Sequence, residues 1–438
     1  MDVDVVVIGM GPGGEAVAGS LAAAGLSVVG VENNLVGGEC PYWGCIPSKA
    51  MVRAGDVLAE GRRLPRFAGS ADIEASWAPV AGRVREVTAA WDDSAAAERF
   101  TGKGGRLVRG AGRITGPKEV TVGDDVFRAR RGVVIATGTV PAVPPIDGLE
   151  GTPYWTNREA IEAEKLPASL IVLGGGAIGC ELAQVFARFG SRVTVLEAGP
   201  RLLGPEEPES SELLRTTFAN DGIDVRVGAK AERVRHDGDG FVINDDLRAE
   251  RLLVAVGRRT NFAGLGLGAV GLDEGARFID VDDRMRAADG VWAVGDLTGK
   301  GAFTHVADYQ ARIAARDILG EDGPGADYRA LPRVTFTDPE IGAVGLTESQ
   351  ARERHSDVRV HSTDLANNTR GWLHRAEGFL KLVEAEGRLV GATSAGPMGG
   401  EILGALAVAV HGEVPVERLR QMIYAFPTFH RAIDAALL

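Results

Sequence analysis

The feature that most constrains this fold is a glycine-rich fingerprint that occurs twice. Each copy reads as a short apolar strand, a turn with three spaced glycines, a helix, and a second strand that ends in a glutamate. The glycines are Gly9, Gly11 and Gly14 in the first copy and Gly174, Gly176 and Gly179 in the second. Glu32 and Glu197 close the two copies, and the interval from first glycine to acid is 23 residues in both.

Each part of this fingerprint has a physical purpose. The first glycine permits a tight turn, the second lets the backbone approach a pyrophosphate, and the third allows close packing of helix on strand. The helix N-terminus stabilises phosphates, and the closing acid binds ribose hydroxyls. Because the first glycines of the two copies lie 165 residues apart, we predict two bound dinucleotides. A flavin and a nicotinamide form such a pair, since a hydride can pass between them.

Length and charge narrow the possible classes of protein. The chain of 438 residues can hold several domains, and its formal net charge of −12 argues against nucleic acid as the main partner. No run of eighteen apolar residues occurs, so we expect no membrane span. The first residues, MDVDVVVIG, carry acids where a signal peptide needs positive charge. We therefore expect a cytoplasmic protein.

A cysteine pair lies in the segment GGECPYWGCIPSK, residues 37–49. Cys40 and Cys45 are five positions apart, and the only other cysteine is Cys180, within the helix of the second fingerprint. In a reducing compartment, close cysteine pairs are usually redox-active or bind metal. Pro47 is expected to start a helix beside them, and a helix dipole lowers the pKa of a neighbouring thiol. A zinc half-site would need further ligands, and no histidine pair has ligand spacing; two inert buried cysteines are the other alternative.

Taken together, these segments resemble the pyridine nucleotide–disulfide oxidoreductases, class I, the group of glutathione reductase, dihydrolipoamide dehydrogenase, mercuric reductase and the soluble transhydrogenase. The resemblance covers nearly the whole chain. Besides the first fingerprint and the cysteine segment, it rests on IATG at 135–138, GGGAIGCE at 174–181, AVGD at 293–296, FTHVADYQ at 303–310 and PRVTFTDPEIGAVGLTE at 332–348.

The resemblance implies an α/β fold with two Rossmann-like domains and a C-terminal α+β domain. The FAD-binding domain would be split between 1–145 and 260–330, the NAD(P)-binding domain would span 146–259, and residues 331–438 would form the interface of a homodimer. Residues matching the family's FAD contacts are Gly9, Gly11, Gly14, Glu32, Gly138, Asp296, Thr304 and His305. Those matching its nicotinamide dinucleotide contacts are Gly174, Gly176, Gly179 and Glu197. Taken alone, Asp296 at the end of an apolar strand would more often be a helix cap or a turn residue.

The resemblance also assigns catalytic roles. Cys45 would face the flavin and take its electrons, and Cys40 would exchange with the substrate. Lys49 and Glu181 match a lysine and a glutamate that pair beside the flavin N5 in relatives; without the resemblance, they could be two surface charges on first turns of helices. Cys180 is expected to serve packing, and no metal site is predicted.

The C-terminal segment departs from the family. Thiol-handling members carry a histidine and a glutamate where this chain has Phe426 and Arg431. A phenyl ring cannot accept a proton, and loss of a general base costs about 10²–10⁴ in rate. We therefore expect the electron acceptor to be a quinone, a dye-like oxidant or a metal ion instead of an ordinary dithiol. Tyr424, Phe426 and Phe429 would then form a flat apolar wall for a planar acceptor, or else pack in the dimer interface.

Two other functions stay open at this point. In the first, His430 replaces the missing base and the protein is a disulfide reductase or dihydrolipoamide dehydrogenase. In the second, the protein is a flavin-binding redox sensor without turnover. For the electron donor we expect NADH over NADPH, because Glu197 would repel a 2′-phosphate. Arg201 lies nearby in sequence, and arginine is the usual partner of that phosphate.

Overall fold

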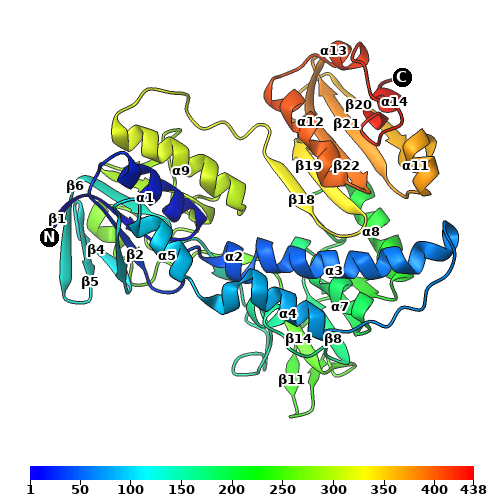
Figure 1. Ribbon diagram of the computed structural model, residues 1–438, viewed down its shortest axis with the longest axis horizontal. Helices are drawn as coiled ribbons and strands as arrows, with labels where there is room; N and C mark the ends of the chain where they lie inside the picture. Colours follow the sequence, from blue (N-terminus) through cyan, green and yellow to red (C-terminus); the bar gives the residue numbers. More distant parts are fainter. The chain divides into compact units, whose positions relative to one another are not determined.

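The computed structural model describes residues 1–438, which divide into two compact units that are each discontinuous in sequence (Figure 1). The first unit comprises residues 1–47, 82–142 and 258–327, and the second comprises 48–81, 143–257 and 328–438. Among the helices, none has the length and apolar character that crossing a membrane requires.

The first unit is built on one mixed sheet. Its strands, in spatial order, are β16 (Arg286–Ala288), β17 (Val291–Ala293), β6 (Asp125–Ile135), β1 (Asp2–Ile8), β2 (Val28–Glu32) and β3 (Arg106–Arg109). From β17 to β3 all neighbours are parallel. The antiparallel strands β4 (Gly112–Gly116) and β5 (Glu119–Val122) join this sheet through β6. The central strand β1 reads as a nearly continuous run of valines because both of its faces are covered.

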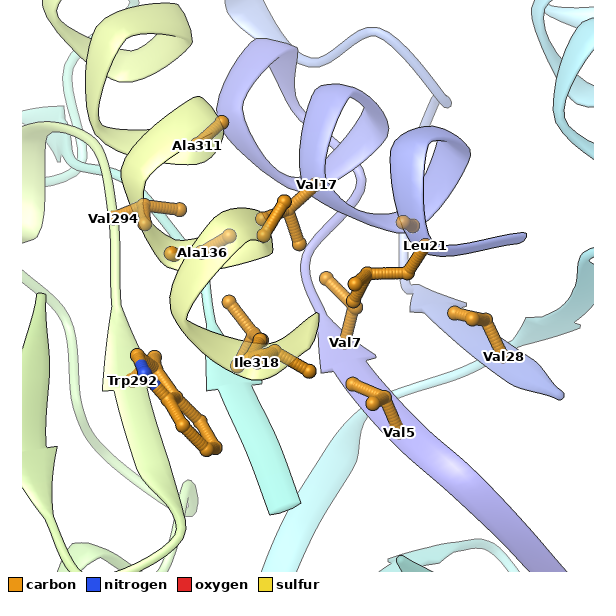
Figure 2. Close-up of a cluster of buried hydrophobic side chains, with 14 of the residues drawn as sticks. Val5, Val7, Val17, Leu21, Val28, Ala136, Trp292, Val294, Ala311 and Ile318 are labelled. Atoms are coloured by element: carbon orange, nitrogen blue, oxygen red, sulfur yellow. The ribbon is translucent and has the colours of Figure 1, made fainter. Parts of the chain in front are cut away.

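Two helices cover one face of this sheet (Figure 2). Val17 and Leu21 of α1 (Pro12–Ala23) and Ile318 of α9 (Thr304–Leu319) join one buried cluster with Val5 and Val7 of β1. Small residues allow the two helices to lie close, since a Cβ on Gly13 would be only 3.3 Å from the Cβ of Ala307. The strand–turn–helix of the first fingerprint is therefore held by apolar packing on α9.

The second unit contains a parallel four-stranded sheet and a separate hairpin layer. The parallel order is β10 (Asp224–Val227), β9 (Arg192–Glu197), β8 (Ser169–Leu173) and β14 (Arg251–Val254). The small antiparallel sheet consists of β11 (Val234–His236), β12 (Phe241–Ile243) and β13 (Leu247–Ala249). Helix α7 (Ala177–Phe189) follows β8, as α1 follows β1.

The C-terminal part of the second unit is an antiparallel sheet with helices. Its strands run in the order β18 (Pro332–Thr335), β19 (Glu340–Gly345), β22 (Arg388–Gly396), β21 (Phe379–Ala385) and β20 (Val358–Asp364). A buried cluster joins this sheet to α12 (Gly399–His411), α13 (Val416–Arg420) and α14 (Ala432–Leu437). The α+β class predicted for this part is confirmed.

The remaining elements include seven α-helices, five short 3-10 helices and one small strand pair. These α-helices are α2 (Glu39–Trp43), α4 (Ala78–Val87), α5 (Ser94–Thr101), α6 (Asn157–Ile161), α8 (Pro208–Asn220), α10 (Glu348–Arg354) and α11 (Thr369–His374). Strand β7 (Val140–Pro141) pairs with β15 (Arg258–Arg259).

One helix start differs from the expectation. Helix α3 (Cys45–Arg63) begins at Cys45, two residues before Pro47. Proline is tolerated in the first turn of a helix, where its missing N–H has no intrahelical partner. Cys45 is therefore the first residue of a helix and not part of the loop before it.

Candidate active site

The first and third glycines of each fingerprint are required by the fold itself. Gly9 has φ +92°, and a Cβ there would lie 2.5 Å from the carbonyl oxygen of Ala136. A Cβ on Gly14 would overlap the carbonyl oxygen of Gly9, and one on Gly179 would overlap that of Gly174. In both copies, glycine is therefore the only residue that lets helix, turn and neighbouring strand approach this closely.

The middle glycines face open space instead. A Cβ on Gly11 would meet nothing closer than the Cα of Gly38 at 3.9 Å, and a Cβ on Gly176 would meet no protein atom within 4 Å. These two residues are the N-caps of α1 and α7, and neither helix has a side-chain capping bond there. The helix N-terminus and the open approach fit a dinucleotide pyrophosphate in both copies.

Glu32 closes the first loop from the end of β2. Its carboxylate accepts hydrogen bonds from the backbone N–H of Met10 at 2.7 Å and of Asn34 at 2.8 Å. Burial raises the pKa of Glu32, although these backbone bonds offset part of that effect. The acid thus holds the turn in shape, and its predicted contact with a ribose stays a prediction.

Glu197 repeats this arrangement in the second loop. Its carboxylate accepts from the N–H of Gly175 at 2.6 Å and of Gly199 at 2.5 Å. Arg201 is the residue that could instead favour NADPH as the electron donor. Its guanidinium donates hydrogen bonds to two carbonyl oxygens of its own loop at 2.6 and 2.9 Å. The guanidinium is therefore engaged by backbone acceptors.

Asp296 lies in a polar network that sequence reasoning missed in part. Its carboxylate accepts from the hydroxyl of Thr139 at 2.6 Å. Arg258 donates to that hydroxyl at 2.8 Å and to the carbonyl of Thr139 at 2.7 Å. Thr139 directly follows Gly138, the last residue of the IATG segment, which has φ +63°. The turn at this glycine was the sequence signal that could have pointed to Thr139.

The two candidate redox cysteines lie on successive helices of one segment. Cys40 is in α2 and Cys45 begins α3, and both are free thiols here. A hydrogen bond to the Cys45 side chain and burial raise the pKa of Cys40. The Sγ of Cys45 lies 3.5 Å from the hydroxyl of Thr304, the first residue of α9. Cys40 thus retains its proton, while Cys45 is next to a helix N-terminus, where negative charge is stabilised.

The third cysteine has a different environment. Cys180 is fully buried, and its thiol donates to the carbonyl of Gly175 at 3.3 Å. No metal-ligating cluster of three or more side chains includes any of the three cysteines. Cys180 is thus a packing residue, distinct from the adjacent pair Cys40 and Cys45.

His305 follows Thr304 in α9. Its ring stacks on that of Phe303, with the ring centroids 5.1 Å apart.

Lys49 and Glu181 are paired by the structure. The Nζ of Lys49 lies 2.7 Å from one carboxylate oxygen of Glu181 and 4.6 Å from the centre of the Phe336 ring. The second oxygen of Glu181 accepts from the N–H of Phe336 at 2.9 Å. The side chain of Glu181 is 5% exposed, so the alternative of two separate surface charges does not hold. Their place beside a flavin stays a prediction.

The expected wall of three C-terminal aromatic residues is wrong. Tyr424 and Phe429 are buried in the core of the C-terminal sheet and helices, and the hydroxyl of Tyr424 donates to the carbonyl of Leu419 at 2.9 Å. Only Phe426 is exposed, with 64% of its surface accessible. The core of this part needs the other two rings, and their burial removes them from any surface.

Around Phe426 the structure places a positive charge. The guanidinium of Arg431 lies 5.4 Å from the centre of the Phe426 ring and 3.4 Å from the carboxylate of Asp434. His430 is half-buried, with its ring 5.7 Å from that of Tyr424. It precedes α14, which begins at Ala432.

Comparison with known proteins covers the whole chain. Residues 3–311 match the pyridine nucleotide-disulphide oxidoreductase family, and residues 331–437 match its dimerisation domain. The mercuric reductase of Streptomyces lividans is 34% identical over 455 residues, covering 99% of this chain and 95% of that protein. The dihydrolipoyl dehydrogenase of Chlorobaculum tepidum is 35% identical over 457 residues, covering 99% and 96%.

A solved structure agrees with these relatives. The HOCl-induced flavoprotein disulfide reductase RclA from Escherichia coli superposes with a TM-score of 0.88 at 28% identity, covering 99% of both chains. RclA has also been solved as a Cu(II) complex.

Proposed function

Since the chain belongs to the pyridine nucleotide–disulfide oxidoreductase family and is an FAD-dependent NAD(P)H oxidoreductase, we propose that it carries electrons from NADH to an acceptor that is not an ordinary dithiol. FAD, when bound, supplies the two-electron carrier that takes a hydride from the nicotinamide and passes both electrons to a disulfide. The Cys40–Cys45 bond would be that disulfide. Its cleavage by two electrons leaves a proton on Cys40 and a thiolate at Cys45.

The contacts of the two thiols support this division of roles. The raised pKa of Cys40 favours its protonated form, and a neutral thiol can donate a hydrogen bond to a neighbouring thiolate. Cys45 lies beside Thr304 at the start of the sixteen-residue helix α9, where the helix dipole stabilises a thiolate. The Lys49–Glu181 pair holds an ammonium one helical turn further along α3.

The observation that carries the choice of acceptor is the exposed ring of Phe426. Thiol-handling members of the family need a base here to move the proton of the interchange thiol, and phenyl cannot serve. Arg431 stacks on this ring, and its charge would disfavour an imidazolium at the same place. The match of residues 331–437 to the dimerisation domain supports a homodimer, in which the family resemblance brings this segment from the partner subunit.

NADH is the preferred donor on this proposal. Glu197 ends β9 with a carboxylate that can bind ribose hydroxyls and would repel a 2′-phosphate. Arg201 donates to two carbonyl oxygens of its own loop, and these two bonds hold its guanidinium within that loop.

A steady-state assay with NADH tests the acceptor. The panel contains a quinone, a dye, Hg(II), Cu(II), lipoamide and glutathione disulfide; the two metal ions are included because of the similarity to mercuric reductases and to RclA, which has a solved Cu(II) complex. We expect the quinone, the dye or a metal ion to be reduced faster than either disulfide. Lipoamide turnover on the order of 10²–10³ per second would refute the proposal, and its loss in His430→Ala would identify His430 as the base. Absence of turnover with every acceptor would favour a redox sensor.

Spectroscopy tests the electron route separately. Titration with NADH should produce a broad absorbance band beyond the oxidised flavin peak, because a Cys45 thiolate lies beside the flavin. Cys45→Ser should abolish this band and leave flavin reduction by NADH intact. Cys180→Ser is the matched control and should leave both unchanged, since Cys180 is buried apart from the pair.

A further inference from the structure

Charged and polar side chains form a continuous network between α3 and α7. On α3, Lys49, Asp56 and Arg63 follow one another at intervals of seven residues, which places them on one face of the helix. Lys49 pairs with Glu181 of α7, and Asp56 accepts from Arg188 of α7 at 2.8 Å. The two helices are thus connected by ion pairs at two successive levels.

Helix α7 holds a third segment through the same face. Its buried residues Glu181, Gln184 and Arg188 all bind residues 336–338, the turn between β18 and β19. The amide of Gln184 accepts from the N–H of Asp338 at 2.8 Å and donates to its carbonyl at 2.9 Å. Arg188 donates to the Asp338 carboxylate at 2.7 Å. This turn is therefore fixed on α7 by side chains that solvent does not reach.

Arg188 is the centre of the network. Its guanidinium binds three carboxylates, those of Asp56, Asp338 and Asp221, the last at 3.3 Å. Arg63 also pairs with Asp338. Burial alone would raise the pKa of Asp338, but Arg188 and Arg63 outweigh this effect and lower it. Asp338 is thus held as a carboxylate between two guanidinium groups.

The helices approach closely at the level of Arg188. A Cβ on Gly55 of α3 would lie 3.5 Å from the Cδ of Arg188 and 3.9 Å from the Cα of Val185. Arg62 of α3 donates to the carbonyl of Arg188 at 2.8 Å. Arg188 is therefore connected to α3 both by its ion pair with Asp56 and by the hydrogen bond from Arg62 to its carbonyl.

We propose that Arg188 and Asp338 are positioning residues for the ammonium of Lys49, an inference that rests on the proposed function. Lys49 is supported by the carboxylate of Glu181 and by the ring of Phe336. Arg188 acts on the Lys49–Glu181 pair through Asp56, which lies on α3 together with Lys49. It acts on the second support through Asp338, two residues after Phe336. Loss of Arg188 therefore weakens both supports of Lys49, although Arg188 itself makes no contact with Lys49.

A second buried cation provides a matched control. Lys381 is 5% exposed and binds Glu207 at 3.0 Å, Glu348 at 2.9 Å and Glu209 at 2.7 Å. Like Arg188, which is 3% exposed, it neutralises three carboxylates in the second unit. None of its partners belongs to α3, α7 or residues 336–338. Removing either cation takes a buried positive charge away from three carboxylates and is expected to destabilise the fold to a similar degree.

The test compares Arg188→Gln with Lys381→Gln in the FAD-loaded protein. Both variants should lower the melting temperature. Arg188→Gln should slow single-turnover flavin reduction by NADH about tenfold or more, because misplacement of a positioned group by about 1 Å can cost up to 10²-fold. It should also raise the apparent pKa at which the long-wavelength band of the reduced enzyme appears, since the ammonium no longer stabilises the Cys45 thiolate. Lys381→Gln should leave the rate within about twofold and the band pKa unchanged.

Three further variants complete the test. Asp338→Asn keeps the backbone bonds to Gln184 and should show a smaller change of the same sign, which serves if Arg188→Gln does not fold; Arg188→Lys should restore part of the rate. Equal effects of Arg188→Gln and Lys381→Gln on rate and band would overturn the proposal. Lys49→Met separates the two hypotheses: normal flavin reduction in this variant refutes the positioning role and leaves the proposed function standing, which the acceptor panel tests on the wild type. Slow reduction in Lys49→Met beside normal reduction in Arg188→Gln and Asp338→Asn also refutes the positioning role, because Lys49 then acts without these two residues.

Discussion

The helices α1 and α7 follow the same kind of glycine loop, but only α7 adds a buried ionic network to its apolar packing. Both begin at an unobstructed glycine and require glycine three residues later. Beyond that point α1 buries Val17 and Leu21 in an apolar contact with α9. In α7 the buried positions include Glu181, Gln184 and Arg188, which bind α3 and residues 336–338. The first helix is therefore held by apolar packing, and the second adds ion pairs to the apolar packing of residues such as Phe186.

We relate this difference to two requirements: a phosphate-binding loop has to be held in place, and the reaction also needs a charged side chain in a fixed orientation. Apolar packing keeps a loop in place, and it suffices where a cofactor only has to be held. Ion pairs also orient individual charged atoms, at the cost of desolvating them. We infer that the ion pairs of α7 orient the side chain of Lys49 near the second loop.

The largest expected effects come from the third glycine of each loop. Gly14→Ala should abolish FAD retention, because its Cβ overlaps the carbonyl oxygen of Gly9; the purified protein should be colourless. Gly179→Ala should instead yield yellow protein that NADH reduces about a hundredfold more slowly, since a rigid backbone clash exceeds the usual overpacking cost of about 1–3 kcal/mol. Absorbance per chain and stopped-flow reduction measure the two effects. Equal loss of FAD in both variants would contradict the separation of the loops.

The middle glycine of the second loop should affect ligand binding and not folding. In Gly176→Ala the new Cβ meets no protein atom within 4 Å, so the melting temperature and FAD content should match those of the wild type. The methyl group occupies the path of the pyrophosphate, and we expect KM for NADH to rise about tenfold, which corresponds to about 1.4 kcal/mol. A melting temperature lowered as much as in Gly179→Ala would show that the space at Gly176 is not open.

The two closing acids allow a matched comparison. Glu197→Gln should raise kcat/KM for NADPH relative to NADH by about tenfold, because removal of the charge ends repulsion of the 2′-phosphate. Glu32→Gln loses an equivalent loop contact and should lower FAD affinity without changing the NADPH-to-NADH ratio. A wild-type enzyme that already prefers NADPH by tenfold would refute the assignment of Glu197.

The smallest expected effect concerns Asp56, one of the carboxylates that bind Arg188 in the network between α3 and α7. Burial raises the pKa of Asp56 to about 6, although Arg188 acts in the opposite direction. A carboxyl whose pKa is higher in the folded state stabilises the fold when protonated, so this contribution is present at low pH and is lost as pH rises through about 6. Asp56→Asn should therefore gain about 1 kcal/mol over the wild type at pH 8, a value reduced for solvent screening because the side chain is 35% exposed.

Chemical denaturation of both proteins at pH 5 and pH 8 measures this difference. The advantage of Asp56→Asn should shrink at pH 5, where the wild-type carboxyl is largely protonated. Arg188, Arg63, Arg53, Asp221 and Asp338 are the charged groups of this network that accompany Asp56. An advantage that is independent of pH would mean that Asp56 is not the group that titrates.

The two nucleotide loops, the family and the class of the C-terminal domain could all be predicted from the amino-acid sequence. Loop chemistry is local, since a turn that needs glycine at fixed offsets and an acid at the end of the next strand depends on residues within 23 positions. Lys49 and Glu181 were also found, but only because they stand in motifs shared with relatives. The departure of Phe426 from the family pattern was visible for the same reason.

The network around Arg188 and the burial of Tyr424 and Phe429 became visible only in the folded chain. Arg188 binds Asp56 and Asp338 across 132 and 150 residues of sequence, and no local pattern marks such partners. A charged residue on a helix is most often solvated, so Arg188 gave no signal, although α7 is buried on almost every side. The two rings likewise look alike in sequence whether they face a ligand or a core. Which side chains are buried depends on how all the helices and strands pack together. This is the physical reason that neither the Arg188 network nor the burial of the two rings could be predicted from local sequence.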